Sequence, residues 1–142
     1  MQKLLELSLK IGKVPIYHPT HLSSSIATAA INSKKFNDYV NKLNQAETGI
    51  TVSRIEILQV EMFSNRVGFI SMRAVTTKDG HPLPSFVFVR GHAVGILLFV
   101  NDKVLLVEQY RVPVQERRLE APAGMIDESD DFVGVAATEI QE

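Results

Sequence analysis

Residues 119–142 read LEAPAGMIDESDDFVGVAATEIQE, and this stretch decides which fold and which site we expect. The turn-forming segment Pro122-Ala123-Gly124 comes first, and an acidic segment over residues 127–131 follows it. Residues 129–131 suit a helix N-terminus, because Ser and Asp cap the free N–H groups there. An apolar stripe with helical spacing follows, made of Val133, Ala136, Ala137 and Ile140. The stretch therefore predicts a tight turn that leads into an amphipathic helix.

Two carboxylates lie beside the apolar stripe of this predicted helix. At about 100° per residue, Glu139 and Glu142 project from neighbouring positions on one side. Two carboxylates so placed can bind one hard cation such as Mg²⁺, which prefers oxygen ligands. Glutamates with this spacing are also common on solvated helix faces. The spacing alone leaves the metal-binding and the surface interpretations open.

Upstream of this stretch, the pattern predicts two helices and several strands. Residues 1–20 alternate in period two and predict a strand. A short helix is expected over residues 25–31, and a second one begins with Ser33 as its N-cap, because apolar residues then recur with helical spacing. Further strands are expected over residues 52–62, 66–75, 85–90, 92–100 and 104–110.

Turn residues predict where the chain reverses between these strands, and strand alternation predicts which side chains share a face. Asp79-Gly80 and Asn101-Asp102 predict two hairpin turns. Residues 93–100 lack alternation, so we expect a central strand covered on both faces. The next strand separates its sides and directs Gln109 and Arg111 to one face. Its C-terminal end opens into a loop, which is a favoured place for a functional site.

Composition narrows the functional classes. The chain has 142 residues, of which 45% are hydrophobic and 22% charged, which suits one ordinary domain. It has no cysteine, so a disulfide framework and a thiolate metal site are excluded. With 15 basic and 16 acidic residues, electrostatics favour neither nucleic acid nor an anionic membrane as a partner. The longest apolar run is too short to span a bilayer, and the start lacks a transit-like pattern, so we expect a cytoplasmic protein.

Counted from Gly124, a carboxylate follows at Asp130, and Thr138-Glu139-Ile140-Gln141-Glu142 begins fourteen residues on. This run resembles the Nudix box, G-x5-E-x7-R-E-U-x-E-E-x-G-U, in which U is a bulky aliphatic residue. Upstream segments at residues 89–94, 107–113 and 120–124 resemble the ADP-ribose and ADP-sugar diphosphatase branch of the Nudix hydrolase superfamily. Two positions depart from the box: Asp130 replaces its first Glu, and Thr138 replaces its Arg.

The resemblance implies a fold and an assembly. It implies an α+β protein with the Nudix α/β/α sandwich and a mixed sheet, incomplete at the C-terminus because Glu142 lies within the box. We expect an N-terminal strand and helical extension over residues 1–48, followed by a partial Nudix domain over residues 49–142. Related diphosphatases often dimerise through their N-terminal parts, so a homodimer through residues 1–60 is expected.

The resemblance also implies a reaction and a site. The reaction is Mg²⁺- or Mn²⁺-dependent hydrolysis of the diphosphate bond in ADP-ribose or ADP-glucose, which yields AMP and a sugar phosphate. Glu139 and Glu142 are the implied catalytic residues and, together with the carbonyl of Ala123, the implied metal ligands. The implied substrate-binding residues are Arg111, Arg90 and Gln109.

Plainer alternatives stay open for several residues. Thr138 and the truncated box are compatible with an inactive Nudix fragment or pseudo-enzyme that acts as a binding module. Arg111 is alternatively an ordinary solvated arginine at the end of a strand. Arg90 is alternatively one member of a structural ion pair, and Glu120 alternatively only braces the turn. His18 and His21 are only weak metal-ligand candidates, and His92 is expected to serve packing rather than catalysis. The aromatic side chains of Phe86, Phe88 and Phe99 are expected in the core.

Overall fold

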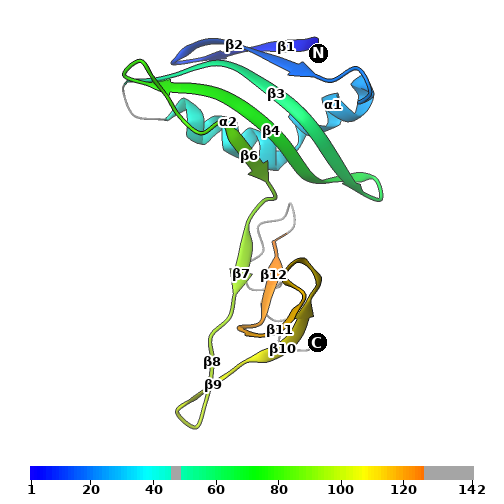
Figure 1. Ribbon diagram of the computed structural model, residues 1–142, viewed down its shortest axis with the longest axis vertical. Helices are drawn as coiled ribbons and strands as arrows, with labels where there is room; N and C mark the ends of the chain where they lie inside the picture. The colour runs from blue at the N-terminus through cyan, green and yellow to red at the C-terminus, as the bar shows by residue number, and fades with distance from the viewer. Residues whose placement is uncertain (46–48, 127–142) are drawn as a thin grey trace. The chain divides into compact units, whose positions relative to one another are not determined.

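The computed structural model describes residues 1–45 and 49–126, and the chain divides into two compact units. The first unit is Met1–Arg90, and the second begins at Gly91 (Figure 1). The domain boundary expected after residue 48 stays a prediction. The two units are defined by compactness alone, which groups the N-terminal strands and helices with the strands that follow them and does not test a domain boundary.

A mixed sheet and two helices build the first unit. The sheet has the order β1-β2-β3-β4-β5, with β6 also paired to β4, and only the β2–β3 pair is parallel. Both helices lie on one face of this sheet (Figure 1). The α+β character expected from the sequence is confirmed. The elements are β1 (Gln2–Leu9), β2 (Gly12–His18), α1 (Ser24–Asn32), α2 (Lys34–Asn44), β3 (Ile50–Phe63), β4 (Arg66–Lys78), β5 (His81–Pro82) and β6 (Phe86–Val89).

The single strand expected over residues 1–20 is wrong, because the chain forms the antiparallel pair β1–β2 there. The turn is at Lys10 and Ile11. Gly12, which pairs with Leu9 across the turn, has φ of +119°, a conformation that glycine adopts without a steric penalty. Period two continues through both strands, so the alternation of apolar residues alone does not reveal the reversal.

Ser33 connects the two helices. It ends α1 and is the N-cap of α2, as expected from the sequence. Its hydroxyl accepts a hydrogen bond from the Phe36 amide at 3.4 Å and donates one to the Ala30 carbonyl at 2.6 Å. One buried side chain therefore satisfies backbone groups at the end of one helix and the start of the next. This double cap defines the junction between the two helices.

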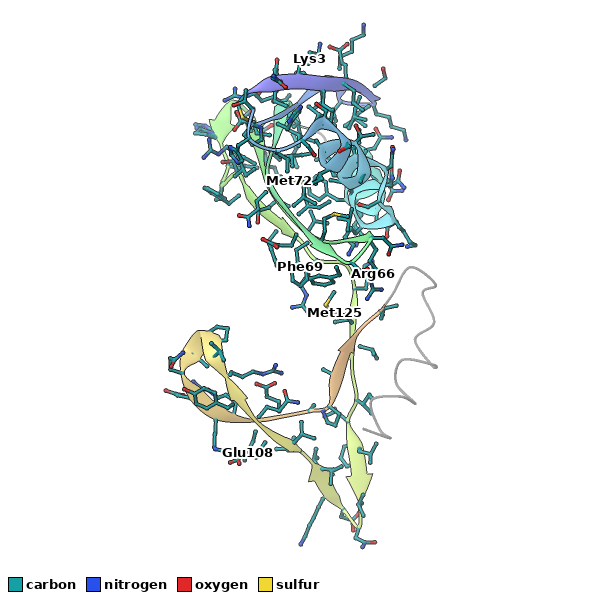
Figure 2. All side chains as sticks on the ribbon, turned by 90° about the vertical axis from the view of Figure 1, so that its right-hand side faces the viewer. Lys3, Arg66, Phe69, Met72, Glu108 and Met125 are labelled. Atoms are coloured by element: carbon teal, nitrogen blue, oxygen red, sulfur yellow. The ribbon has the colours of Figure 1, made fainter. Side chains whose placement is uncertain are left out.

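The core of the first unit lies between the helices and the sheet. The long strands β3 and β4 supply fully buried side chains, among them Ile57 and its cross-strand neighbour Met72. Figure 2 shows Met72 on the side of the sheet that faces the helices. The helices contribute Ile31 and Phe36, which are buried as well. The remaining buried members of this cluster are Val14, Ile16, Ala30, Val40, Val52, Ile55, Val67, Ile70, Ala74 and Val89.

Both expected hairpin turns are confirmed. Asp79 and Gly80 have φ of +50° and +82° and connect β4 to β5. Asn101 and Asp102 have φ of +49° and +62° and connect two strands of the second unit. Positive φ at both central residues is the requirement of the type I′ hairpin, which Asn, Asp and Gly meet most easily.

Short strands in pairs build the second unit. The pairs are β7–β12, β8–β9 and β10–β11, all antiparallel. A single 3₁₀ turn, η1, connects β10 to β11. The elements are β7 (Ala93–Gly95), β8 (Leu98–Val100), β9 (Lys103–Leu105), β10 (Val107–Arg111), η1 (Val112–Val114), β11 (Glu116–Glu120) and β12 (Ala123–Met125).

Two expectations for this unit are wrong. The expected strand over residues 92–100 is divided into β7 and β8, and it is not covered on both faces, because Leu97 and Phe99 are 67% and 69% exposed. The expected strand over residues 104–110 is likewise interrupted, at Leu106. In a continuous apolar run the residues on both faces of a strand are apolar. The sequence therefore does not indicate which face is covered or at which residue the strand pairing ends.

Among the described residues, none of the helices has the length and apolar character needed to cross a membrane.

The β3–β4 packing generates a stability prediction. Ile57→Ala is expected to lower the free energy of unfolding by about 2–5 kcal/mol, because it removes a fully buried side chain and leaves a cavity. Leu83→Ala is the matched control: Leu83 is 38% exposed, and we expect a change below about 1 kcal/mol. Urea denaturation of both variants measures the difference. Equal losses contradict the core described here.

Candidate active site

The β10–β11 hairpin positions two of the expected substrate-binding residues. The chain leaves β10 at Arg111, turns through η1, and enters β11 after Gln115, which has φ of +57°. The Gln115 side chain donates a hydrogen bond to the Val112 carbonyl at 2.6 Å and accepts one from the Tyr110 hydroxyl at 3.2 Å. These bonds close the turn, so the hairpin presents its side chains in a defined register.

Strand alternation gives this hairpin two different faces. Gln109 and Arg111 lie on one face, and their cross-strand partners Arg118 and Glu116 lie beside them. Glu120 belongs to the same face, because it pairs with Val107. The shared face of Gln109 and Arg111, expected from the sequence, is therefore present. The opposite face carries the ion pair between Glu108 and Arg117, whose charged atoms are 3.0 Å apart (Figure 2 labels Glu108).

A two-point ion pair joins Arg111 to Glu120. Arg111 Nε donates to both carboxylate oxygens, at 2.9 and 3.0 Å, and Nη2 donates to Oε2 as well. These charge-assisted bonds from Arg111 hold the pKa of Glu120 below its ordinary value, against a smaller upward effect of desolvation. The same hydrogen bonds raise the pKa of Arg111. Both groups are therefore charged at neutral pH.

The sequence did not identify Glu120 as the partner of Arg111. The two residues are nine apart in the sequence, and bracing the turn is the alternative left open for Glu120, with no pairing to Arg111 expected. The signal that could have identified the pair is the alternation of side chains in β10 and β11. Once the hairpin register is known, one face is seen to hold residues 107, 109, 111, 116, 118 and 120. That register depends on the irregular turn at η1, which the sequence did not predict.

Ala123, the expected carbonyl ligand, is the first residue of β12. The Pro122 carbonyl accepts a bond from the Ile96 amide at 2.8 Å, and the Ile126 amide donates to the His92 carbonyl at 3.0 Å. In an antiparallel pair the hydrogen-bonded positions alternate, so Ala123, opposite Gly95, is a non-hydrogen-bonded position. Its carbonyl therefore points away from β7. A carbonyl oxygen in this orientation is able to bind a ligand.

The other expected metal ligands, Glu139 and Glu142, lie outside the described residues, and so do Asp130 and Thr138. Within residues 1–45 and 49–126, histidine and acidic side chains form no group of three that suits a metal ion. Of the three expected metal ligands, the described residues therefore include the Ala123 carbonyl alone. It is a hard oxygen donor of the kind that Mg²⁺ prefers.

Arg90, the remaining expected phosphate-binding residue, is exposed and directly follows β6. It ends the first unit, whereas Arg111 and Gln109 belong to the second. Its role stays a prediction.

The histidines and phenylalanines have different outcomes. His18 is buried, and its Nδ1 donates to the Pro19 carbonyl at 3.0 Å, as a packing histidine does. His92 is exposed, so the packing role expected for it is wrong. The core positions expected for three phenylalanines are wrong too: Phe86, Phe88 and Phe99 are 75%, 58% and 69% exposed. In β6 both faces are apolar in sequence, and only the face of Val87 and Val89 packs on the core.

Comparison of the sequence with known proteins shows which proteins this chain is similar to. The chain is 37% identical over 134 residues to "Nudix hydrolase 14, chloroplastic" from Arabidopsis thaliana, which covers 85% of this chain and 43% of that protein. It is 29% identical over 83 residues to "Methanol dehydrogenase activator" from Bacillus methanolicus, which covers 58% of this chain and 45% of that protein. No family model and no solved structure matches the chain.

The first similarity supports the Nudix superfamily, the family that residues 119–142 resemble. It includes most of this chain, so it extends well beyond the box itself. The chain spans less than half the length of either curated relative. What the whole protein does is therefore a matter for proposal.

The Arg111–Glu120 pair generates a prediction about titration. Because Arg111 lowers the pKa of Glu120, Arg111→Ala is expected to raise that pKa toward its ordinary value. The stabilisation from the pair is present above the ordinary carboxyl pKa and is lost as the pH falls through the lowered one. Carboxyl-carbon NMR titration of Glu120 measures both values. Arg117→Ala, which removes the ion pair on the opposite face, is the control and leaves the Glu120 pKa unchanged.

Proposed function

We propose that this chain is part of a Nudix hydrolase that cleaves the diphosphate bond of a nucleoside diphosphate sugar of the ADP-ribose or ADP-glucose type. Water adds to one phosphorus, and the bridging oxygen leaves with the other, so that AMP and a sugar phosphate form. The observation that carries the proposal is the outward-facing Ala123 carbonyl directly before the box-like sequence, in the same unit as the oriented Arg111. The similarity to a Nudix hydrolase over most of the chain supports it.

Charge is the main obstacle in this reaction, because a diphosphate repels an incoming nucleophile. Arg111 is proposed to bind the phosphate oxygens, since a planar guanidinium offers several donors in a fixed arrangement. Gln109, on the same face of β10, adds a neutral amide donor. Arg90 is proposed as a further phosphate ligand, supported by its exposure. These side chains bind and orient the diphosphate.

The proposed metal ligands are the carbonyl of Ala123 and the carboxylates of Glu139 and Glu142. An all-oxygen set with two negative charges suits Mg²⁺ or Mn²⁺. Such ions, when bound, neutralise phosphate oxygens and make water a better nucleophile at neutral pH. Glu139 and Glu142 are the proposed catalytic residues because they keep these ions at the reacting diphosphate. The orientation of Ala123 away from β7 is the structural support for this set.

A second candidate is a catalytically inactive Nudix fragment or pseudo-enzyme that acts as a nucleotide-binding or interaction module. It is favoured by Thr138, which stands where the box has an arginine that orients its glutamates. The exposed apolar side chains of the second unit favour it as well, because they suit contact with another surface. The activity assay below separates the two candidates.

The proposed fold is the Nudix α/β/α sandwich, incomplete at the C-terminus of this chain. Support comes from the second unit, whose described strands and connecting segments expose large apolar side chains that further strands and helices of a sandwich would cover. These side chains are Leu97, Phe99, Val100, Val104, Leu105, Leu106, Tyr110, Val112, Val114 and Leu119.

A homodimer through residues 1–60 is part of the proposal. The edge strand β1, which pairs only with β2 among the described strands, is the support, because an unpaired edge is able to pair with a second copy. Light scattering coupled to sizing chromatography is expected to give twice the mass of one chain. A purely monomeric protein at tens of micromolar contradicts this assembly.

A cytoplasmic location remains a prediction. The name of the Arabidopsis relative includes "chloroplastic", so fractionation of cells that express the natural protein is the deciding measurement.

Substrate and metal requirements form the first test. The intact natural protein is expected to release AMP from ADP-ribose or ADP-glucose with Mg²⁺, and EDTA is expected to abolish the release, because the ions supply several kcal/mol of charge stabilisation. Restoring Mg²⁺ or Mn²⁺ in excess recovers activity. Binding of these nucleotides without any AMP release supports the inactive module instead.

The carboxylates form the second test. Glu142→Gln and Glu139→Gln are each expected to lower kcat at least ~10²-fold, because the loss of one anionic ligand removes several kcal/mol of stabilisation. Glu108→Gln is the control, since Glu108 forms an exposed ion pair on the opposite face of the β10–β11 hairpin. Full activity of Glu142→Gln, measured as AMP release, excludes it as a metal ligand.

A further inference from the structure

The hydrogen bonds of Arg111 bypass the acid nearest to it across the hairpin. Arg111 is registered opposite Glu116, and Glu120 is registered opposite Val107. The guanidinium of Arg111 nevertheless bonds Glu120, and Glu116 pairs with Arg118 at 2.6 Å instead. The Arg111 side chain therefore runs back along the hairpin, toward the end of β11 that leads into β12. This direction needs a reason beyond simple charge proximity.

We propose that Glu120 is a positioning residue, which holds the guanidinium of Arg111 beside the segment that leads into β12 and Ala123, so that it meets the diphosphate of the substrate. This inference rests on the proposed function, because it concerns how Arg111 binds phosphate. It assigns to Glu120 a role through Arg111 rather than direct contact with the substrate or the metal ions.

The bonding pattern leaves one edge of the guanidinium available. A guanidinium has five N–H donors, and Glu120 takes those on the Nε and Nη2 side. Within the part of the chain that the structure describes, Nη1 donates to no other group. The Nη1 and Nη2 hydrogens that remain form a second planar edge, which matches two phosphate oxygens. Glu120 thus fixes one edge and orients the other.

The position of Glu120 in the chain brings this edge near the expected metal site. Glu120 is three residues before Ala123, and three residues span at most ~11 Å between Cα atoms. The carbonyl of Ala123 points away from β7, as derived above. The guanidinium is therefore bound to the side chain of a residue that lies no more than ~11 Å, between Cα atoms, from the expected carbonyl ligand.

A purely structural role explains the pair less well. The Arg111 and Glu120 side chains are 48% and 31% exposed, and ion pairs with such exposure contribute little to stability. Fixing a long side chain before binding has a larger effect on affinity, because the free protein has already lost the rotamer freedom that binding would otherwise remove. The pair is therefore better suited to preorganising Arg111 than to stabilising the hairpin.

The experiment compares the intact unaltered protein with four variants by AMP release and thermal melting. Glu120→Gln is expected to raise the KM for the nucleoside diphosphate sugar about tenfold, with kcat and the Mg²⁺ half-saturation concentration unchanged, because a single side-chain ordering step has about this weight. Glu120→Asp keeps the carboxylate and is expected to recover part of the loss. The control Glu108→Gln removes the ion pair on the other face and leaves KM unchanged.

The decisive variant exchanges the two charges, Arg111→Glu together with Glu120→Arg. It retains an ion pair, so we expect the melting temperature of the unaltered protein. It turns the guanidinium donors away from their proposed position, so we expect KM to stay at least tenfold raised. Recovery of both KM and melting temperature overturns the inference, because it shows that any ion pair suffices. An unchanged KM in Glu120→Gln, or a lower kcat with a shifted Mg²⁺ requirement, overturns it as well.

A readout without substrate separates this inference from the proposed function. In the unaltered protein the Arg111 Nε–H signal in ¹⁵N NMR is expected to exchange slowly with water, and in Glu120→Gln it is expected to exchange at the rate of a free arginine. The same fast exchange in both forms overturns the positioning role. Slow exchange in a protein that hydrolyses no nucleotide sugar contradicts the proposed function alone and leaves the positioning of Arg111 supported.

Discussion

Strand alternation is the constraint on which both units depend. Successive side chains of a strand point to opposite faces, so pairing register decides which residues meet. In the first unit this parity directs Ile57 and Met72 toward the helices and places the ion pair of Glu56 and Arg73 on the opposite face. In the second it brings Arg111 and Glu120 to one face of a hairpin. The same rule thus builds a core in one place and a candidate site in the other.

The two units use this constraint with different energetic results. In the first, helices α1 and α2 cover one face of the sheet, so alternation becomes the burial of apolar area. In the described part of the second, only Pro122 and Ile126 are buried. The hydrogen bonds of the ladders and the turn therefore carry most of its order there. The side chains of the candidate site are consequently held by polar contacts, of which the Arg111–Glu120 pair is the most extensive.

Backbone groups contribute to the candidate site as much as side chains do. The outward direction of the Ala123 carbonyl follows from two ladder hydrogen bonds, at Pro122 and at Ile126, and from the alternation between them. Proline fits at position 122 because its missing N–H removes only one bond of this short ladder.

Local patterns in the sequence determined the elements that depend on near neighbours. Ser33 as a helix cap and the turns at Asp79-Gly80 and Asn101-Asp102 were predictable, because capping and positive φ are properties of one or two residues. The shared face of Gln109 and Arg111 was predictable for the same reason. Only the tertiary structure decided which apolar surfaces are covered, as the exposed Phe86 and Phe99 demonstrate. It alone decided that Arg111 bonds Glu120, because pairing across an irregular turn depends on a register that neither strand encodes by itself.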